Sequence, residues 1–154
     1  MKISELMTKE ALVIKASVPV DRMTKLFAKH EITGAPVIDE SGDLIGVVSM
    51  SDMARKTEGE RQDKHEYYLN PSWGAIPTHS HEEAQSKTVG DIMTNLIIYA
   101  EEDDDIEVAA DLMVNHGIHR VVVTKNNKVV GVISSSDLVR EFRDRIRAAK
   151  RLQG

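Results

Sequence analysis

The chain contains no cysteine, and this absence removes several classes of site at once. Disulfide bonds, a thiolate nucleophile and a cysteine-ligated metal are all excluded. Aromatic residues make up only 4% of the chain, and no apolar run approaches the ~20 residues of a membrane-spanning helix. Charges at Glu5, Lys9 and Lys15 interrupt the first residues, so we expect no signal peptide. These absences favour a protein of the reducing cytoplasm that has no membrane partner.

Neither sign of charge is in large excess. Lys and Arg number 20 against 25 Asp and Glu, which gives a formal charge of −5. This weak negative charge provides no general attraction to nucleic acid or to acidic membranes. Hydrophobic residues make up 41% of the 154 residues, a share typical of a globular protein with one ordinary domain or two small units that share a core.

One motif occurs twice, which indicates that the chain is a duplicated unit. Residues 46–52 read Gly-Val-Val-Ser-Met-Ser-Asp, and residues 131–137 read Gly-Val-Ile-Ser-Ser-Ser-Asp. A Met-Thr dipeptide also opens each copy, at residues 7–8 and 93–94. We place the first repeat at residues 1–57, the connector at 58–88 and the second repeat at 89–154.

Both copies carry the same order of periodic signals. A short β-branched run predicts a strand, an amphipathic pattern predicts a helix, and two apolar runs around a Gly or Asn turn predict a hairpin. In the first copy these are a strand at 12–14, a helix from near Ser17 that buries Val20, Met23, Leu26 and Phe27, and strands at 35–38 and 44–48. In the second they are a strand at 96–98, a helix from near Asp103 that buries Ile106, Ala109, Ala110, Met113 and Val114, and strands at 121–123 and 129–133. A closing helix makes each unit β-α-β-β-α.

Each motif runs a strand into two hydroxyls and a carboxylate where a helix should begin. Asp52 and Asp137 are therefore candidates to accept hydrogen bonds from both hydroxyls of a ribose. The alternative is that they cap the helix. The serines offer hydroxyls to a phosphate near the helix N-terminus, or they form a capping-box variant with the Asp. The candidate phosphate ligands here are Ser49, Ser51, Ser134 and Ser136.

These features resemble the tandem cystathionine-β-synthase (CBS) domain pair, or Bateman module, over nearly the whole chain. The resemblance rests on the Met-Thr dipeptides, the two Gly-x-x-Ser-x-Ser-Asp motifs and the runs 34–39 and 119–123. It implies an α+β fold in which two tandem β-α-β-β-α repeats pack with pseudo-twofold symmetry. It also implies two clefts for an adenosine ligand such as AMP, ADP, ATP or S-adenosylmethionine, and no catalysis by the module itself.

The resemblance further assigns roles to individual residues. Asp52 and Asp137 would bind the ribose, and His119 with Arg120 would bind phosphate, for which a guanidinium fork is well suited. The first copy has Thr33-Gly34 at the matching positions, so we expect clefts of unequal affinity. We expect the adenine to lie near the start of each repeat, with Thr8, Val13, Thr94 and Ile98 as candidate walls.

The remaining segments leave alternatives open. The connector aromatics, Tyr67, Tyr68 and Trp73, would seal the edge of the core, or else line a dimer contact or a ligand site. We expect a solvated loop rather than a metal site at His65, His79 and His81. The acidic run 101–105 would complement a helix dipole or bind a divalent cation. The pattern of residues 137–152 predicts an amphipathic helix that docks on the core or on a second chain. The alternative is that this segment binds nucleic acid.

We therefore expect a stand-alone regulatory module that forms a homodimer and signals ligand occupancy to an effector protein on another chain. We assign no catalytic residue, no catalytic cofactor and no metal site. Two other functions remain open at this point. One is a structural dimerisation module with empty clefts. The other is a nucleotide-processing enzyme with Asp52 or Asp137 as a base, although the sequence fixes no His or Lys beside either one.

Overall fold

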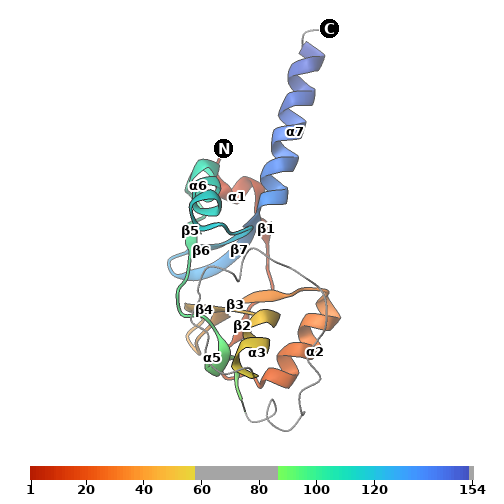
Figure 1. The fold of residues 1–154 in the computed structure, drawn as a ribbon. Helices are drawn as coiled ribbons and strands as arrows, with labels where there is room; N and C mark the ends of the chain where they lie inside the picture. The colour runs from red at the N-terminus through yellow and green to blue at the C-terminus, as the bar shows by residue number, and fades with distance from the viewer. Residues whose placement is uncertain (58–86, 153–154) are drawn as a thin grey trace. The chain divides into compact units, whose positions relative to one another are not determined.

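The computed structural model describes residues 1–57 and 87–152, which fold into two compact units (Figure 1). Unit 1 comprises Met1–Ala11, Ile98–Asn126 and Val130–Gly154, and unit 2 comprises Leu12–Ile97 and Asn127–Val129. The first eleven residues of the chain therefore belong with the second repeat and not with the first. The aromatic residues and histidines of the connector lie outside the described residues.

Unit 1 is a four-stranded sheet with helices packed against it. Its elements are α1 (Ile3–Leu6), β1 (Thr8–Lys9), β5 (Tyr99–Glu101), α6 (Ile106–His116), β6 (Arg120–Lys125), β7 (Lys128–Ser134) and α7 (Ser135–Leu152). The strand order is β1-β7-β6-β5. Strand β1 pairs antiparallel with β7, which places Thr8 opposite Val132, and β5 runs parallel to β6. The N-terminal strand of the chain is thus an edge strand of the sheet built by the second repeat.

The start of the chain also supplies part of the core of unit 1. Ile3 and Met7 are buried in one apolar cluster with Val121, Val123 and Ile133. The backbone N–H of Ile3 donates to the carbonyl of Asp104 at 2.9 Å, and this bond anchors α1 beside the turn that precedes α6. Burial of these apolar side chains is the main favourable term that holds the N-terminal segment in place.

Unit 2 has a three-stranded sheet, of order β2-β3-β4. Its elements are β2 (Ile14–Lys15), α2 (Val20–His30), β3 (Gly34–Ile38), β4 (Leu44–Ser49), α3 (Met50–Thr57) and α5 (Val89–Ile92). Helix α2 buries Val20, Met23 and Phe27 against the sheet, at the i, i+3, i+7 spacing that its sequence predicts. Residues from the start of the second repeat complete this core, because Val89 and Ile92 of α5 are buried in the same cluster.

Both hairpin turns follow the turn chemistry expected from the sequence. Gly42 has φ of +84°, and Asn126 and Asn127 have φ of +50° and +63°. Glycine and asparagine tolerate this left-handed region better than other residues do. The predicted hairpins are confirmed, with strand bounds that differ from the prediction by one to two residues.

Several expected boundaries were wrong. The strands expected at 12–14 and 96–98 lie further along the chain, at Ile14–Lys15 and Tyr99–Glu101. The helices expected from Ser17 and Asp103 begin at Val20 and Ile106, because the residues before them form extended N-caps at Pro19 and Asp105. Val114, expected in the core, is 80% exposed. On α6, Leu112 packs against the core instead, since it lies on the same face as Ala109 and Met113.

No helix in the described ranges 1–57 and 87–152 is long and apolar enough to span a membrane.

Candidate functional site

In the first repeat, Asp52 lies in the first turn of the helix that follows Ser49. One of its carboxylate oxygens, Oδ2, accepts hydrogen bonds from the backbone N–H of Ser49 at 2.7 Å and from the Ser49 hydroxyl at 3.2 Å. The other oxygen, Oδ1, lies 3.4 Å from the hydroxyl oxygen of Thr94, which donates to it. Only 4% of Asp52 is exposed to solvent. The carboxylate is therefore held in one orientation by groups from both repeats.

The second repeat builds the same arrangement at Asp137, within unit 1. Oδ2 accepts from the Ser134 backbone N–H at 2.8 Å and from the Ser134 hydroxyl at 2.7 Å. The Asp137 N–H in turn donates to the Ser134 hydroxyl oxygen at 3.3 Å. Asp137 is 8% exposed. Because a buried carboxylate is costly unless it is hydrogen-bonded, the repeated serine is part of what keeps each Asp in place.

These bonds are the capping arrangement that the sequence allowed as one reading of the motif. In both repeats the Asp reaches back to the N–H of the serine that precedes the helix, as in a capping box. Ser51 and Ser136, in the first turn of α3 and α7, are exposed. Capping fixes the orientation of each carboxylate. A carboxylate can accept more hydrogen bonds than those that one serine donates.

The glycine of each motif is explained by the Met-Thr dipeptide of the other repeat. A β-carbon at Gly131 would lie 2.6 Å from the Thr8 carbonyl oxygen and 2.8 Å from the Met7 sulfur. A β-carbon at Gly46 would lie 2.7 Å from the Met93 sulfur and 2.9 Å from the Thr94 carbonyl oxygen. The two signatures that identify the duplication are therefore packed against each other, each time across repeats.

This cross-repeat packing changes which adenine candidates lie beside which carboxylate. Thr94, at the start of the second repeat, contacts Asp52 of the first, and Thr8 lies on β1 beside the strand that leads to Ser134. Val13 lies in unit 2, just before β2, and Ile98 packs against the core of unit 1. Sequence reasoning missed the pairing of Thr94 with Asp52, since 42 residues separate them.

The basic pair His119-Arg120 lies at the start of β6, beside the start of α7. The His119 carbonyl accepts a hydrogen bond from the Ser135 N–H at 2.9 Å, and both the His119 and Arg120 residues are exposed. In the first repeat the Thr33 carbonyl accepts from the Met50 N–H at 2.9 Å. The structure thus brings His119 and Arg120 to the same strand-to-helix junction as Asp137, within one unit.

Arg140 is a site residue that the sequence analysis did not single out. Its Nη1 donates to Asp137 Oδ1 at 3.1 Å, one helical turn along α7. This ion pair joins an exposed guanidinium to a largely buried carboxylate, because the Arg140 side chain is 61% exposed and the Asp137 side chain 10%. The signal was present, because an Arg three residues after an Asp in a helix lies on the same face.

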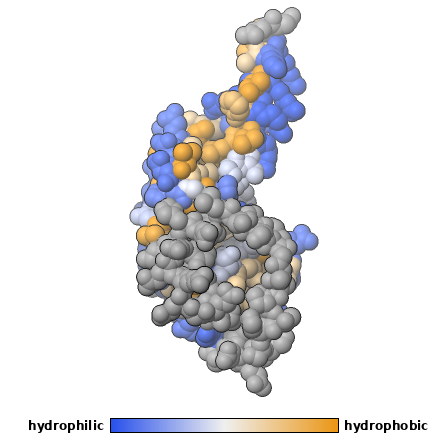
Figure 2. All heavy atoms as spheres, in the orientation of Figure 1, coloured by the Kyte–Doolittle hydropathy of each residue, from blue (hydrophilic) through white to orange (hydrophobic). Residues whose placement is uncertain are grey.

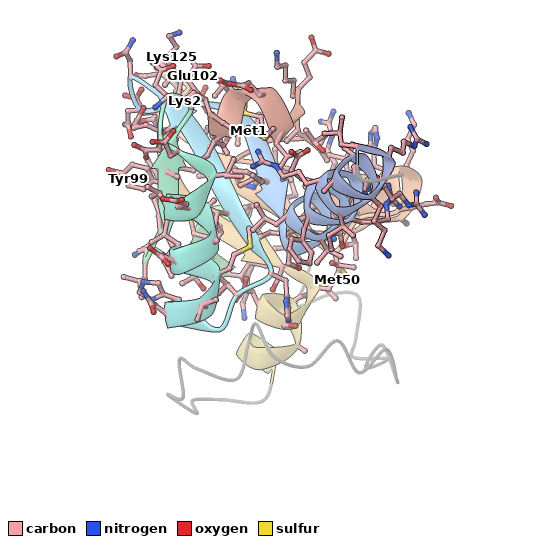
Figure 3. The ribbon with its side chains drawn as sticks, turned by 90° about the horizontal axis from the view of Figure 1, so that it is seen from above. Met1, Lys2, Met50, Tyr99, Glu102 and Lys125 are labelled. Carbon is pink, nitrogen blue, oxygen red and sulfur yellow. The ribbon has the colours of Figure 1, made fainter. Side chains whose placement is uncertain are left out.

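The acidic run 101–105 is largely engaged by local partners. Lys125 pairs with Glu102 (Figure 3). Lys2 pairs with Asp105 at 3.0 Å. The Lys2 ammonium, through its hydrogen bond, lowers the pKa of Asp105 from its usual value. The described part of the chain contains no group of three His, Cys, Asp or Glu side chains placed to hold a metal ion.

Comparison with known proteins identifies the repeats. The family model of the CBS domain matches residues 3–59 and again residues 89–144. The chain belongs to the CBS domain family. Both matches contain a complete motif with its serine and aspartate, so the family assignment and the duplicated site rest on the same segments.

Relatives among known proteins support this assignment. The uncharacterised protein MJ1426 of Methanocaldococcus jannaschii is 30% identical over 160 residues, which cover 90% of this chain and 89% of the relative. The chloroplastic CBS domain-containing protein CBSX1 of Arabidopsis thaliana is 31% identical over 90% of this chain, which spans 62% of CBSX1. L-aspartate semialdehyde sulfurtransferase of M. jannaschii matches over only 23% of its own length.

Solved structures of CBS pairs have the same fold. CBSX2 of A. thaliana is similar with a TM-score of 0.72 and 26% identity, over 95% of this chain and 96% of that one. A structure of CBSX2 in complex with AMP is similar with a TM-score of 0.66 and 25% identity, over 99% and 98% of the two chains. The CBS pair of MJ0100, in complex with 5′-methylthioadenosine and S-adenosyl-L-methionine, has a TM-score of 0.68 and 23% identity, over 94% and 98%.

Proposed function

We propose that this CBS pair is a regulatory sensor that binds an adenosine ligand at each repeat, with Asp52 and Asp137 as the ribose acceptors. The observation that supports this most strongly is the duplication of a buried, oriented carboxylate with a hydroxyl beside it. A carboxylate fixed in this way accepts hydrogen bonds from two vicinal hydroxyls without a further ordering cost. Relatives with the same fold have been crystallised with AMP, 5′-methylthioadenosine and S-adenosylmethionine.

The phosphate end of a nucleotide is the part on which the two repeats would differ. The second repeat has His119 and Arg120 where the chain reaches the strand-to-helix junction of Asp137, and both residues are exposed, whereas the first repeat has Thr33 and Gly34 at the matching positions. An exposed guanidinium is a good bidentate partner for phosphate. Ser136 adds an exposed hydroxyl at the same junction. Ser134, the other candidate, would have to release the hydrogen bond that its hydroxyl donates to Asp137. We therefore expect the second repeat to hold the tighter nucleotide site.

The adenine would be bound by the opening segments of the repeats. Thr94 is the candidate wall that contacts Asp52, and Thr8 the one that lies nearest the motif strand of the second repeat. Val13 and Ile98 remain candidate walls on the segments that follow. These positions are proposals for the base, which carries no charge and is held by apolar contact and backbone groups.

Signalling would require a partner, and we propose a homodimer that acts on an effector protein. Apolar side chains on α7 are exposed in the single chain, among them Phe142 at 65%. Burial of such side chains under a second copy of the chain is favourable, because apolar surface is removed from water. Ligand binding would then regulate the effector by a change in dimer geometry. The size of this change depends on how much better the ligand binds one dimer geometry than the other.

A thermal-shift screen tests the binding proposal. A ligand that binds only the native state raises the melting temperature, so AMP, ADP, ATP, S-adenosylmethionine and NAD are each added at millimolar concentration. We expect a shift with at least one adenosine ligand. Asp137→Ala should abolish the largest shift, and Asp144→Ala, on the exposed part of α7, should preserve it.

A structural dimerisation module without ligand is the second candidate function. It is favoured by the capping bonds, which give Asp52 and Asp137 a role in the helix starts that needs no ligand. On this alternative no adenosine compound shifts the melting temperature. Asp137→Ala then lowers the free energy of unfolding of the ligand-free protein by the cost of a lost cap, about 0.5–2 kcal/mol, and the melting temperature falls with it.

A further inference from the structure

The ion pair between Arg140 and Asp137 occupies the carboxylate oxygen that the capping serine leaves available. Oδ2 of Asp137 is taken by Ser134, and Oδ1 accepts from Arg140 at 3.1 Å. The carboxylate is buried, while the Arg140 side chain is 61% exposed. Arg140 is therefore the mobile member of the pair, because its long side chain can leave Asp137 without disturbing the core.

A ribose that binds to Asp137 would compete with Arg140 for this oxygen. Displacing the guanidinium separates an ion pair, which costs less if the guanidinium finds another anion. A nucleotide carries such an anion, because its phosphate is attached to the same sugar. The His119 carbonyl, just before β6, accepts a hydrogen bond from the Ser135 N–H at the start of α7, and the exposed residue Arg120 follows His119 in the chain.

We propose that Arg140 is an exchangeable counter-ion of Asp137, which moves from the carboxylate to the phosphate of an incoming nucleotide. The inference rests on the proposed function and defines its ligand class. The second-repeat site would prefer adenosine nucleotides to adenosine, since an uncharged nucleoside displaces Arg140 without offering it a partner. It would also prefer AMP to S-adenosylmethionine, because the sulfonium and ammonium groups of that ligand outweigh its single carboxylate and leave a net positive charge near Arg140.

The test compares the preference for AMP over adenosine in three proteins. Isothermal titration gives the Kd of each ligand for the wild type, for Arg140→Gln and for Arg143→Gln. Arg143 is the matched control, because it lies on the same helix and pairs at 2.8 Å with Asp144 in an exposed ion pair. Each titration is repeated in an Asp52→Asn background, so that the measured Kd reports binding at the second repeat alone.

We expect Arg140→Gln to reduce the preference for AMP over adenosine by about ten-fold, the scale of one charge-assisted hydrogen bond. The Kd for adenosine should stay the same or fall, because the carboxylate no longer has to release a cation. Arg143→Gln should leave both constants unchanged. S-adenosylmethionine should bind the wild type no better than adenosine does, and relatively better to Arg140→Gln.

Two results would overturn the inference. If Arg140→Gln binds AMP and adenosine in the wild-type ratio, Arg140 does not exchange onto phosphate. If it weakens both ligands equally, Arg140 only positions Asp137. Both results leave the proposed function intact, since the wild type binds in each case. A wild type that binds neither ligand nor any nucleotide in the screen contradicts the proposed function and this inference together.

Discussion

At the scale of single residues, the space around Gly131 shows how tightly the two repeats depend on each other's sequence. The Thr8 carbonyl would lie 2.6 Å from a β-carbon at this position, well inside van der Waals contact, and a carbonyl in a paired strand has little room to move. Gly46 has the same relation to Thr94. The glycine is thus required by close approach of another strand, and not by its own backbone angles.

We predict that Gly131→Ala destabilises unit 1 by about 1–3 kcal/mol, the usual cost of overpacking. Its added methyl group must push β1 away from β7. Urea denaturation with a probe in unit 1 measures the change. Gly34→Ala is the comparison variant, followed with a probe in unit 2, where Gly34 lies. We expect a smaller loss there, because its β-carbon would lie 3.2 Å from the Val48 carbonyl oxygen against 2.6 Å at Gly131. Equal losses for the two variants would contradict the close-approach explanation.

At the scale of elements, α7 divides into a docked start and an exposed remainder. Leu138 packs against the core of unit 1, whereas Val139 and Phe142 are each 65% exposed and Ile146 is 40% exposed. These three lie three and four residues apart, on one face of the helix. Figure 2 shows hydrophobic side chains along α7 beside strongly hydrophilic ones. This face is the part of α7 that a second copy would cover.

We predict that Phe142→Glu combined with Ile146→Glu shifts the protein toward monomer, because two charges would be buried in the proposed dimer contact. Light scattering at micromolar concentration measures the effect. Val114→Glu on α6 is the control, since Val114 is also an exposed apolar residue but lies on another helix. A wild-type protein that is already monomeric would contradict the homodimer.

At the scale of the whole molecule, the order of the chain and the order of the folded units differ. Residues 1–11 complete the sheet and core of unit 1, while α5 from the second repeat completes the core of unit 2. Each unit therefore needs sequence from both repeats. A fragment cut at the repeat boundary would lose part of both cores.

We predict that Ile3→Ala destabilises unit 1 by about 2–5 kcal/mol, the cost of a cavity left by a fully buried isoleucine. Hydrogen exchange read by mass spectrometry should report faster exchange in β6 and β7, elements that lie far from residue 3 in the sequence. Ile14→Ala should act instead on β3 and β4 of unit 2, because Ile14 belongs to that core. Unchanged exchange in β6 after Ile3→Ala would refute this assignment.

The sequence by itself determined the duplication, the mixed helix and strand content, the hairpins and the helix that follows each Ser-x-Ser-Asp motif. These features depend on local periodicity and on turn residues such as Gly42 and Asn126, whose preferences act over a few positions. The choice of Asp52 and Asp137 as candidate ribose acceptors also came from the motif, and it stays a prediction. Their capping bonds to the adjacent serines were one of the two readings that three-residue spacing allowed.

Only the tertiary structure decided which segments meet. It joined Thr94 to Asp52 and the start of the chain to the second repeat, and it left Val114 in solvent. It also placed Arg140 on the free oxygen of Asp137, although local helix spacing permitted that contact. Long-range pairing is decided by which apolar surfaces fit together over the whole chain, and no local pattern of residues encodes that fit.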